Sequence, residues 1–365
     1  MSTVRANAIL DASGGNTATI NSMTPTADSL QGFRNRIING DMRIDQRNAG
    51  ASVTPASAVY TLDRWIANVA GSGASKFSVQ RSTTAPTGFV NSMLATSTSA
   101  YSIASGDITA IVQVIEGFNV ADLAWGTANA KTITISFWVR SSLTGTFGGA
   151  LYNGSFNRSY PFTYTISSAN TFEYKTITIA GDTSGTWATN NSFGIGLSFG
   201  LGVGSTYSGT AGAWAGALYV SATGATSLVG TNGATFYITG VQLEVGSVAT
   251  PFERRDYGAE LALCQRYYER TADADNYFTS QVRSDTGAKV IQMIPFAVAK
   301  RTAPTVSFTT SSFTSPDGLV FELMGGYPTR AVTVSIATTS GIAIASVPSA
   351  VVNGLNGGWL ASAEL

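Results

Sequence analysis

Carboxylate side chains are the groups in this sequence best suited to acid and base chemistry. The pairs nearest in sequence are Glu116 with Asp122, Glu173 with Asp182, and Glu244 with Glu253. Two carboxylates that flank a glycosidic bond can hydrolyse it, one as general acid and the other as nucleophile or base. None of the three pairs stands out by its surroundings, so we predict no catalytic residues and no enzyme. A glycan-degrading enzyme is the alternative.

Histidine is absent from the 365 residues, and Cys264 is the single cysteine. Histidine is the side chain that most often acts as a general base near neutral pH. Its absence excludes Ser-His-Asp and Cys-His catalytic arrangements as well as zinc sites with histidine ligands. A single cysteine cannot form a disulfide within the chain, so stability must come from packing and assembly. The composition therefore favours a structural protein.

Calcium is the metal ion that the oxygen-bearing side chains could bind. Asn39 and Asp41 belong to an early loop, and Glu244 belongs to a predicted strand near the end of the same domain. Some sandwich domains bind a structural Ca²⁺ with oxygen ligands from such a loop and the last strand. The sequence has no dense ligand motif such as DxDxDG. These three residues are only a candidate, and we otherwise predict no metal site and no cofactor.

The densest basic stretch lies between residues 34 and 47. Its charged residues are Arg34, Arg36, Asp41, Arg43, Asp45 and Arg47. The alternation of charges favours a salt-bridged surface over a phosphate-binding site. The formal net charge of the chain is zero, which gives no argument for a nucleic-acid partner. No apolar run reaches the roughly 20 residues that span a bilayer, so we also predict no membrane insertion.

Aromatic residues with amide neighbours suggest contacts to a sugar. Sugar-binding sandwiches usually offer an aromatic platform flanked by amides and carboxylates. The predicted glycan contacts are Tyr152, Asn157, Tyr160, Trp187 and Trp214. The alternative is that each aromatic ring covers its own sheet. Trp65, Trp125 and Trp138 lie in apolar stretches and are predicted to be in the core.

Short alternating segments predict a mainly β protein. Charged residues make up 12% of the chain, against about 25% in ordinary soluble domains. In residues 132–140 the odd positions carry Ile, Ile, Phe and Val, and the even positions carry Thr, Thr, Ser, Trp and Arg. Residues 174–179 and 236–245 repeat this period of two, the latter with a bulge expected at Gly240. We predict an antiparallel β-sandwich of the jelly-roll type.

One predicted strand, residues 194–203, is unusual because every even position is Gly or Ser while every odd position is apolar. Its apolar face belongs in the core. Its other face has almost no side chains, so another group can come close to the backbone. This face is either a shallow groove for a sugar ring or a neighbouring subunit, or it is covered by a loop or by aromatic rings of the same chain.

Four parts are predicted along the chain. Residues 1–32 form an attachment or trimerisation arm with a short β-hairpin, or else a disordered terminus. Residues 33–256 form the sandwich, and residues 257–270 form a short linking helix. Residues 271–365 form a second, smaller β domain, with alternation at 289–294, 305–308, 319–323 and 331–336.

The predicted helix carries a stripe of larger side chains at helical spacing. Its members are Tyr257, Leu261, Cys264 and Tyr268, separated by four, three and four positions. Asp256 is a suitable N-cap, whereas Arg266 and Arg270 suit the C-terminal end of the helix dipole. A helix this short is not stable alone. It packs either on a sandwich edge or against copies of itself around a symmetry axis, which would make the stripe an oligomer contact.

Seven short stretches follow one another between residues 33 and 270 and can be compared with other proteins. They are FRNRIINGDM from Phe33, LDRW from Leu62, DLAWGT from Asp122, SFWVRSS from Ser136, ITGVQLEVG from Ile238, TPFERR from Thr250 and LCQRYY from Leu263. Together these stretches resemble a recurring family of phage tail and virion proteins. Residues 1–32 loosely resemble the arms of tail fibres, and the C-terminal domain resembles variable tip domains.

The resemblance implies a jelly-roll sandwich similar to carbohydrate-binding modules, usually trimeric, in the tail of a virion. It supplies no catalytic residues. We therefore expect a homotrimeric tail fibre that is assembled in the host cytoplasm. Its arm would bind other tail or baseplate proteins, and its distal domain would contact a host-surface glycan. The alternatives are a glycan-degrading tailspike-type enzyme and a baseplate or capsid decoration protein that serves assembly alone.

Overall fold

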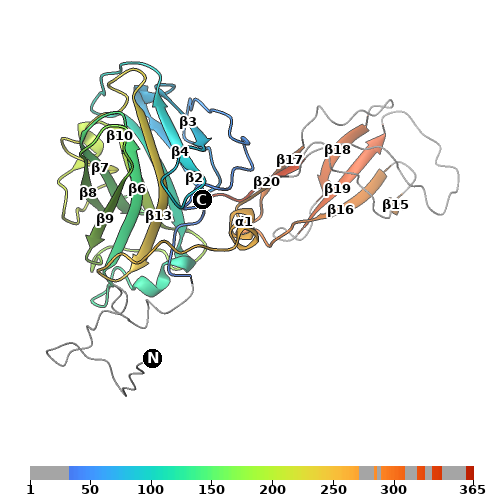
Figure 1. The fold of residues 1–365 in the computed structure, drawn as a ribbon. Coiled ribbons are helices and arrows are strands. Elements are labelled where there is room, and N and C mark those ends of the chain that lie inside the picture. The colour runs from blue at the N-terminus through green and yellow to red at the C-terminus, as the bar shows by residue number, and fades with distance from the viewer. Residues whose placement is uncertain (1–32, 271–282, 286–288, 309–318, 325–330, 339–358) are drawn as a thin grey trace, which may run out of the picture. The chain divides into compact units, whose positions relative to one another are not determined.

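The computed structural model describes residues 33–270, 283–285, 289–308, 319–324, 331–338 and 359–365. The chain divides into two compact units, the first ending at Arg254 and the second beginning at Arg255. β-Strands dominate both units (Figure 1), so the predicted mainly β class is confirmed. The predicted N-terminal arm, residues 1–32, lies outside the described residues.

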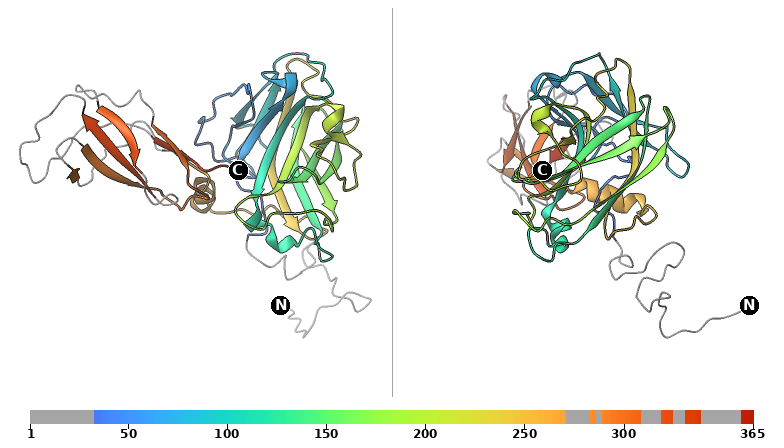
Figure 2. Two further views of the ribbon diagram at one scale, coloured as in Figure 1. Left: turned by 180° about the vertical axis from the view of Figure 1, so that it is seen from behind. Right: turned by 90° about the vertical axis from the view of Figure 1, so that its left-hand side faces the viewer.

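Two antiparallel sheets form the first unit (Figure 2). The six-stranded sheet has the order β1 (Val59–Tyr60), β2 (Trp65–Ala70), β5 (Ile108–Glu116), β10 (Phe193–Val203), β7 (Gly145–Asn153) and β8 (Ser159–Ile166). The five-stranded sheet has the order β3 (Phe77–Ser82), β4 (Ser92–Ser97), β13 (Thr235–Val245), β6 (Ile133–Ser141) and β9 (Glu173–Ile179). Buried side chains from both sheets form one apolar core, so the fold is the predicted β-sandwich.

Shorter elements connect these strands. They are the parallel pair β11 (Ser208–Gly209) and β12 (Ser221–Ala222), and the 3₁₀ helices η1 (Gly71–Gly73), η2 (Gly117–Asn119), η3 (Ala121–Leu123) and η4 (Ser205–Tyr207). Each 3₁₀ helix is a single turn of three residues. They are therefore parts of the loops that connect the strands.

Strand β6 shows how the period of two builds the core. Ile133, Ile135, Phe137 and Val139 are fully buried, because alternate side chains of a strand point to the same face of the sheet. Phe137 meets Phe199 of the opposite sheet edge to face, with the ring centroids 5.0 Å apart. Each such side chain contributes about 1.5–3 kcal/mol by leaving water. The alternation alone therefore places this strand with its odd residues inward.

Strand β13 contains the predicted bulge. Its pairing register with β6 shifts between Thr239 and Gln242, and Gly240 has a φ of 60°. A Cβ atom at Gly240 would lie 2.6 Å from the Phe89 ring, so glycine is required for both conformation and space. The extra residue lets Ile238 and Val241 both point into the core.

The glycine-rich face of β10 is covered by its own chain. A Cβ atom at Gly196 would lie 2.5 Å from the Tyr152 ring, and one at Gly200 would lie 2.6 Å from the Ser221 hydroxyl. The hydroxyl of Ser198 donates a 2.5 Å hydrogen bond to the carbonyl of Val220. The groove hypothesis for this face is therefore wrong, and cover by a loop and an aromatic ring is confirmed. The small residues are present because other backbone and rings pack directly on the strand.

In the second unit the helix is shorter than predicted. Helix α1 spans Tyr257–Gln265, and Asp256 caps it by accepting a 2.9 Å hydrogen bond from the backbone N–H of Gly258. Residues Tyr268–Arg270 form strand β14, which pairs with β20 (Trp359–Ser362). The prediction of a helix through residue 270 was wrong because this long-range strand pairing overrides the local helical spacing.

The predicted oligomer stripe is broken for the same reason. Tyr257 is exposed, Leu261 is half-buried and Cys264 is buried on α1. Tyr268 is buried on β14 rather than on the helix. These four residues therefore do not form one helical surface. A contact between copies of the chain at Tyr257 or Leu261 stays a prediction.

The rest of the second unit consists of strands. A three-stranded sheet has the order β14, β20 and β17 (Thr305–Phe308), and a four-stranded sheet has the order β15 (Arg283–Asp285), β16 (Lys289–Pro295), β19 (Ala331–Thr338) and β18 (Leu319–Met324). The alternating segments predicted at 289–294, 305–308, 319–323 and 331–336 correspond to β16, β17, β18 and β19. Across the described part of the chain, no helix is both long and apolar enough to cross a membrane.

Candidate functional site

Three of the predicted glycan contacts come together with a fourth aromatic residue at one end of the sandwich. Trp214 has its ring centroid 5.2 Å from Tyr160, 5.6 Å from Trp187 and 5.3 Å from Trp125. Trp125 and Trp187 are 4.8 Å apart. All four pairs meet edge to face, a geometry that stabilises aromatic clusters. The sequence indicated these residues singly and gave no sign of their convergence.

The indole N–H groups of this cluster hold neighbouring loops. Trp125 donates to the carbonyl of Lys131 at 2.8 Å, Trp187 to Ser184 at 3.2 Å and Trp214 to Ala180 at 2.8 Å. Trp125 and Trp187 are buried, whereas Trp214 and Tyr160 are half-buried. Desolvation raises the pKa of the Tyr160 hydroxyl. The cluster therefore acts mainly as cover for its own sheets.

The other two predicted contacts have different surroundings. Tyr152 is buried over Gly196, and desolvation raises the pKa of its hydroxyl strongly. Asn157 is exposed at the turn between β7 and β8, where it accepts a 2.8 Å hydrogen bond from Asn153. Tyr152 therefore packs inside the domain, whereas the side chain of Asn157 is exposed to solvent.

A buried ion pair fixes the loops around the cluster. Asp182 is buried and accepts two hydrogen bonds of 2.7 Å from the Nε and Nη2 atoms of Arg158. These hydrogen bonds are the main reason why the pKa of Arg158 is raised. Asp182 also accepts a 3.0 Å hydrogen bond from the backbone N–H of Ser184, whose carbonyl binds Trp187. This candidate catalytic carboxylate thus has a structural role.

Three more of the candidate carboxylates have partners in the chain. Asp122 pairs with Arg36 at 2.7 Å, and Glu173 pairs with Lys175 at 2.6 Å. Desolvation would raise the pKa of Glu173, but hydrogen bonds from Lys175 and two backbone N–H groups outweigh it and lower the pKa. Glu253 accepts from the backbone N–H groups of residues 34 and 35 at 3.2 and 2.8 Å. These three carboxylates are therefore engaged in interactions within the chain.

The three calcium candidates are likewise engaged. Asn39 binds the backbone of Ile44 through both its amide atoms, at 2.8 and 3.0 Å. Asp41 forms an ion pair with Arg43, and Glu244 accepts hydrogen bonds from Thr250 at 2.6 and 2.8 Å. Calcium binding would have to displace these bonds. In the residues that the structure covers, no group of three or more acidic, cysteine or histidine side chains could hold a metal ion.

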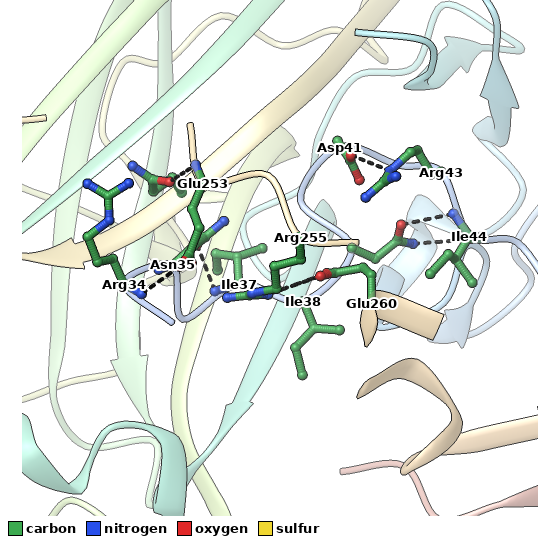
Figure 3. A network of polar contacts seen from close by, with 12 residues as sticks. Arg34, Asn35, Ile37, Ile38, Asp41, Arg43, Ile44, Glu253, Arg255 and Glu260 are labelled. Carbon is green, nitrogen blue, oxygen red and sulfur yellow. Dashed lines mark hydrogen bonds and ion pairs between the residues drawn. The ribbon is translucent and has the colours of Figure 1, made fainter. Parts of the chain in front are cut away.

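The segment FRNRIINGDM forms hydrogen bonds with three of the other motifs, LDRW, ITGVQLEVG and TPFERR, and Figure 3 shows part of this network. Asn35 donates to the carbonyl of Val241 at 3.1 Å and accepts from the N–H groups of Ile37 and Leu243 at 2.9 and 3.1 Å. The backbone N–H of Arg36 donates to the carbonyl of Leu243 at 2.9 Å. Before the Gly240 bulge, one edge of β13 pairs with β4. Beyond the bulge, the segment at residues 35 and 36 forms hydrogen bonds with β13 in place of β4.

The network continues into the LDRW motif and strand β5. Asn39 donates to the carbonyl of Asp63 at 3.0 Å, and its own carbonyl accepts from the Trp65 indole at 3.0 Å. Gln113 bonds both backbone groups of Ile38 at 2.9 Å. The salt-bridged surface predicted for the basic stretch is confirmed at Arg36 and Arg43. In FRNRIINGDM, LDRW and ITGVQLEVG, buried polar groups thus satisfy one another, which is a packing role.

The outer face of the five-stranded sheet carries aromatic residues that sequence reasoning misplaced. Trp65 and Trp125 are buried as predicted, but Trp138 is half-buried on the outer face of β6. Its even position in the alternating strand was the signal for this orientation, and the apolar surroundings were misleading. Trp138 lies opposite Tyr174 of β9 with the ring centroids 5.4 Å apart. Tyr174 is 44% exposed.

We name this surface the outer aromatic face and define it as Trp138, Arg140, Phe172, Tyr174 and Tyr237. The guanidinium of Arg140 lies 5.0 Å from the ring centre of Tyr237 and 5.9 Å from that of Phe172. The remaining half of the same sheet face is covered, since Thr134 and Gln242 are buried and bond residues 246 and 250. The outer aromatic face is therefore the open half of this sheet.

Comparisons with known proteins give fold-level likeness only. No protein-family model matches the chain, and no curated protein matches it. Similar solved structures include the enzymatically active domain of tailspike protein 4 from bacteriophage CBA120, at 11% identity and a TM-score of 0.30; the match covers 59% of this chain and 22% of that one. A CBM4 structure matches at 14% identity over 57% of this chain and 98% of the other, with a TM-score of 0.30. The CBM22-1–GH10 modules of Clostridium thermocellum xylanase 10B match at 11% identity, 57% and 30% coverage and a TM-score of 0.26. Likeness at this level carries no argument about function.

Proposed function

We propose that this chain is a non-enzymatic structural protein of a phage tail, a homotrimeric fibre that binds a glycan on the host surface. The assignment of the chain to a phage tail is based on the seven sequence motifs. Glycan binding rests on one observation, the half-open Trp138–Tyr174 pair on the sheet face. The C–H groups on one side of a sugar ring pack against aromatic faces, which carry partial negative charge. The exposed hydroxyl of Thr176 lies next to the pair on β9.

The sandwich thus offers a glycan surface in addition to the distal domain. Contact through residues 271–365 stays a prediction, because most side chains of that domain lie outside the described residues. The alternative of a purely assembly role predicts that virions without this protein adsorb normally to cells. The tail-fibre proposal predicts that such virions lose adsorption.

Replacing Trp138 by alanine is expected to weaken glycan binding by about 30-fold, the effect of losing a central tryptophan contact worth about 2 kcal/mol. Binding of the purified full chain to immobilised host lipopolysaccharide or capsule measures it. Phe118→Ala is the matched control, because Phe118 is exposed on η2, away from this sheet face. Equal binding by the Trp138 variant and the wild type would refute the surface. Release of new reducing ends from the glycan would refute the non-enzymatic assignment.

Sedimentation tests the oligomer. The full-length protein is expected to sediment with three times the 37.9 kDa mass of one chain. The low charge of the chain, 12% charged residues, and its partly open aromatic face suit a subunit that is packed in an assembly. A stable monomer at micromolar concentration would contradict the trimer, while the glycan-binding surface would remain testable on that monomer.

A further inference from the structure

Arg140 occupies a fixed position on the outer aromatic face. It lies on β6 directly opposite Tyr237 of β13, and its guanidinium is close to the rings of both Tyr237 and Phe172. The attraction between a cation and the face of an aromatic ring restrains a long side chain that would otherwise move freely. The charge is therefore held at the surface beside the Trp138–Tyr174 pair.

Within the described residues, no hydrogen-bond acceptor or carboxylate partners Arg140. Its interactions there are with aromatic rings, and its Nε atom is buried, so an external ligand would meet the two Nη atoms. The carboxylate on the neighbouring strand, Glu173, is occupied by Lys175 and by the backbone N–H groups of Ser167 and Ser168. A guanidinium carries five N–H donors and no acceptor, and the four on the Nη atoms are the ones that an anion from outside the chain can reach.

The same molecule shows how its arginines behave where an anion is supplied internally. Arg158 forms two 2.7 Å hydrogen bonds with Asp182, and Arg36 forms a 2.7 Å ion pair with Asp122. Arg254 also lies over aromatic rings, those of Phe89 and Phe252, but donates to the carbonyl of residue 88. Stacking on a ring thus does not by itself leave an arginine without an acceptor. Arg140 differs from Arg254 in that no carbonyl of the described residues accepts from it.

We propose that Arg140 binds an anionic substituent, a carboxylate or a phosphate, on the glycan whose sugar ring packs on Trp138 and Tyr174. The planar guanidinium fork fits both groups with two parallel hydrogen bonds. Trp138 and Arg140 are two positions apart on one strand face, about 7 Å along the strand, which puts the anion site next to the ring site. The inference rests on the proposed glycan binding and names the class of glycan as acidic.

The test uses the purified full chain on a glycan array that contains uronic-acid, phosphorylated and neutral bacterial glycans. The wild type is expected to bind acidic glycans, and Arg140→Gln is expected to bind them about 10- to 100-fold less, as the loss of a charged hydrogen-bond pair predicts. Arg140→Lys keeps the charge without the fork and should recover part of the binding. Lys76→Gln is the matched control, because Lys76 also stacks on a ring, that of Tyr101, ahead of strand β3.

Competition on the unmodified protein gives a second measurement that needs no variant. Glucuronate should displace the array ligand better than glucose if the anion is a carboxylate, and inorganic phosphate should displace it better if the anion is a phosphate. If the wild type binds neutral glycans alone, or if Arg140→Gln binds acidic glycans as well as the wild type, the anion site is refuted while glycan binding stands. If no glycan is bound, both proposals fail. If Arg140→Gln changes the sedimentation instead of glycan binding, the face is a subunit contact and the proposal is overturned.

Discussion

Replacing Asp182 by alanine is expected to lower the free energy of unfolding of the sandwich by about 3–5 kcal/mol, the cost of breaking a buried ion pair from one side. Asp182 is buried, and both its oxygen atoms bind Arg158 at 2.7 Å. The side chain of Arg158 is 19% exposed. Its guanidinium would lose both acceptors and could not fully recover them from water.

The effect of this substitution should extend to the tryptophan cluster. Asp182 also accepts from the N–H of Ser184, whose carbonyl holds the indole of Trp187. Loosening this turn exposes Trp187 and its neighbour Trp214 to water, which shifts the emission to longer wavelength. Urea unfolding followed by tryptophan fluorescence measures both effects, because five of the six tryptophans lie in the sandwich unit.

Asp122→Ala provides the matched control. Asp122 also pairs with an arginine at 2.7 Å, but its side chain is 44% exposed. Exposed ion pairs contribute about 0–1 kcal/mol because water and salt screen them. An Asp182 variant as stable as the Asp122 variant would show that the Arg158–Asp182 pair does not hold the loops. It would also reopen the catalytic hypothesis for this carboxylate.

Local patterns predicted the strands well, because the period of two depends only on neighbouring residues. The inward residues of β6 and the bulge at Gly240 both followed from it. The end of α1 did not, since β14 pairs with β20, a strand about 90 positions later in the chain. The cover over Gly196 also depends on a distant residue, Tyr152. Pairings across long separations leave no mark in a single sequence.

The candidate site was predictable only in part for the same reason. The sequence identified Trp187 and Trp214 as aromatic candidates, but only the fold shows that they pack on each other. The apolar neighbours of Trp138 predict a core position, which is wrong. Its even position in the alternating strand indicates the outer face, where the side chain lies half-buried. The role proposed for Arg140 depends on its position between the rings of Tyr237 and Phe172, which no local pattern shows.

Replacing Asn35 by alanine is expected to lower the free energy of unfolding by about 3 kcal/mol, because three buried backbone groups lose their partner at about 1 kcal/mol or more each. Asn35 is buried, and its amide bonds the carbonyl of Val241 and the N–H groups of Ile37 and Leu243. Alanine can replace none of these bonds. Asn232→Ala, at an exposed turn, is the control and should change stability by less than about 0.5 kcal/mol.

Hydrogen exchange can separate the loss of this side chain from a general loss of stability. The N–H of Leu243 donates to Asn35, whereas the N–H groups of β13 before the bulge lie between β4 and β6. The variant should therefore lose protection at Leu243 more than at Phe236, since local opening adds to global unfolding only beyond the bulge. Equal loss at both positions would show that the segment at residues 34–40 does not stabilise this edge separately. In that case the hydrogen bonds between FRNRIINGDM and ITGVQLEVG would not explain why these two motifs occur together.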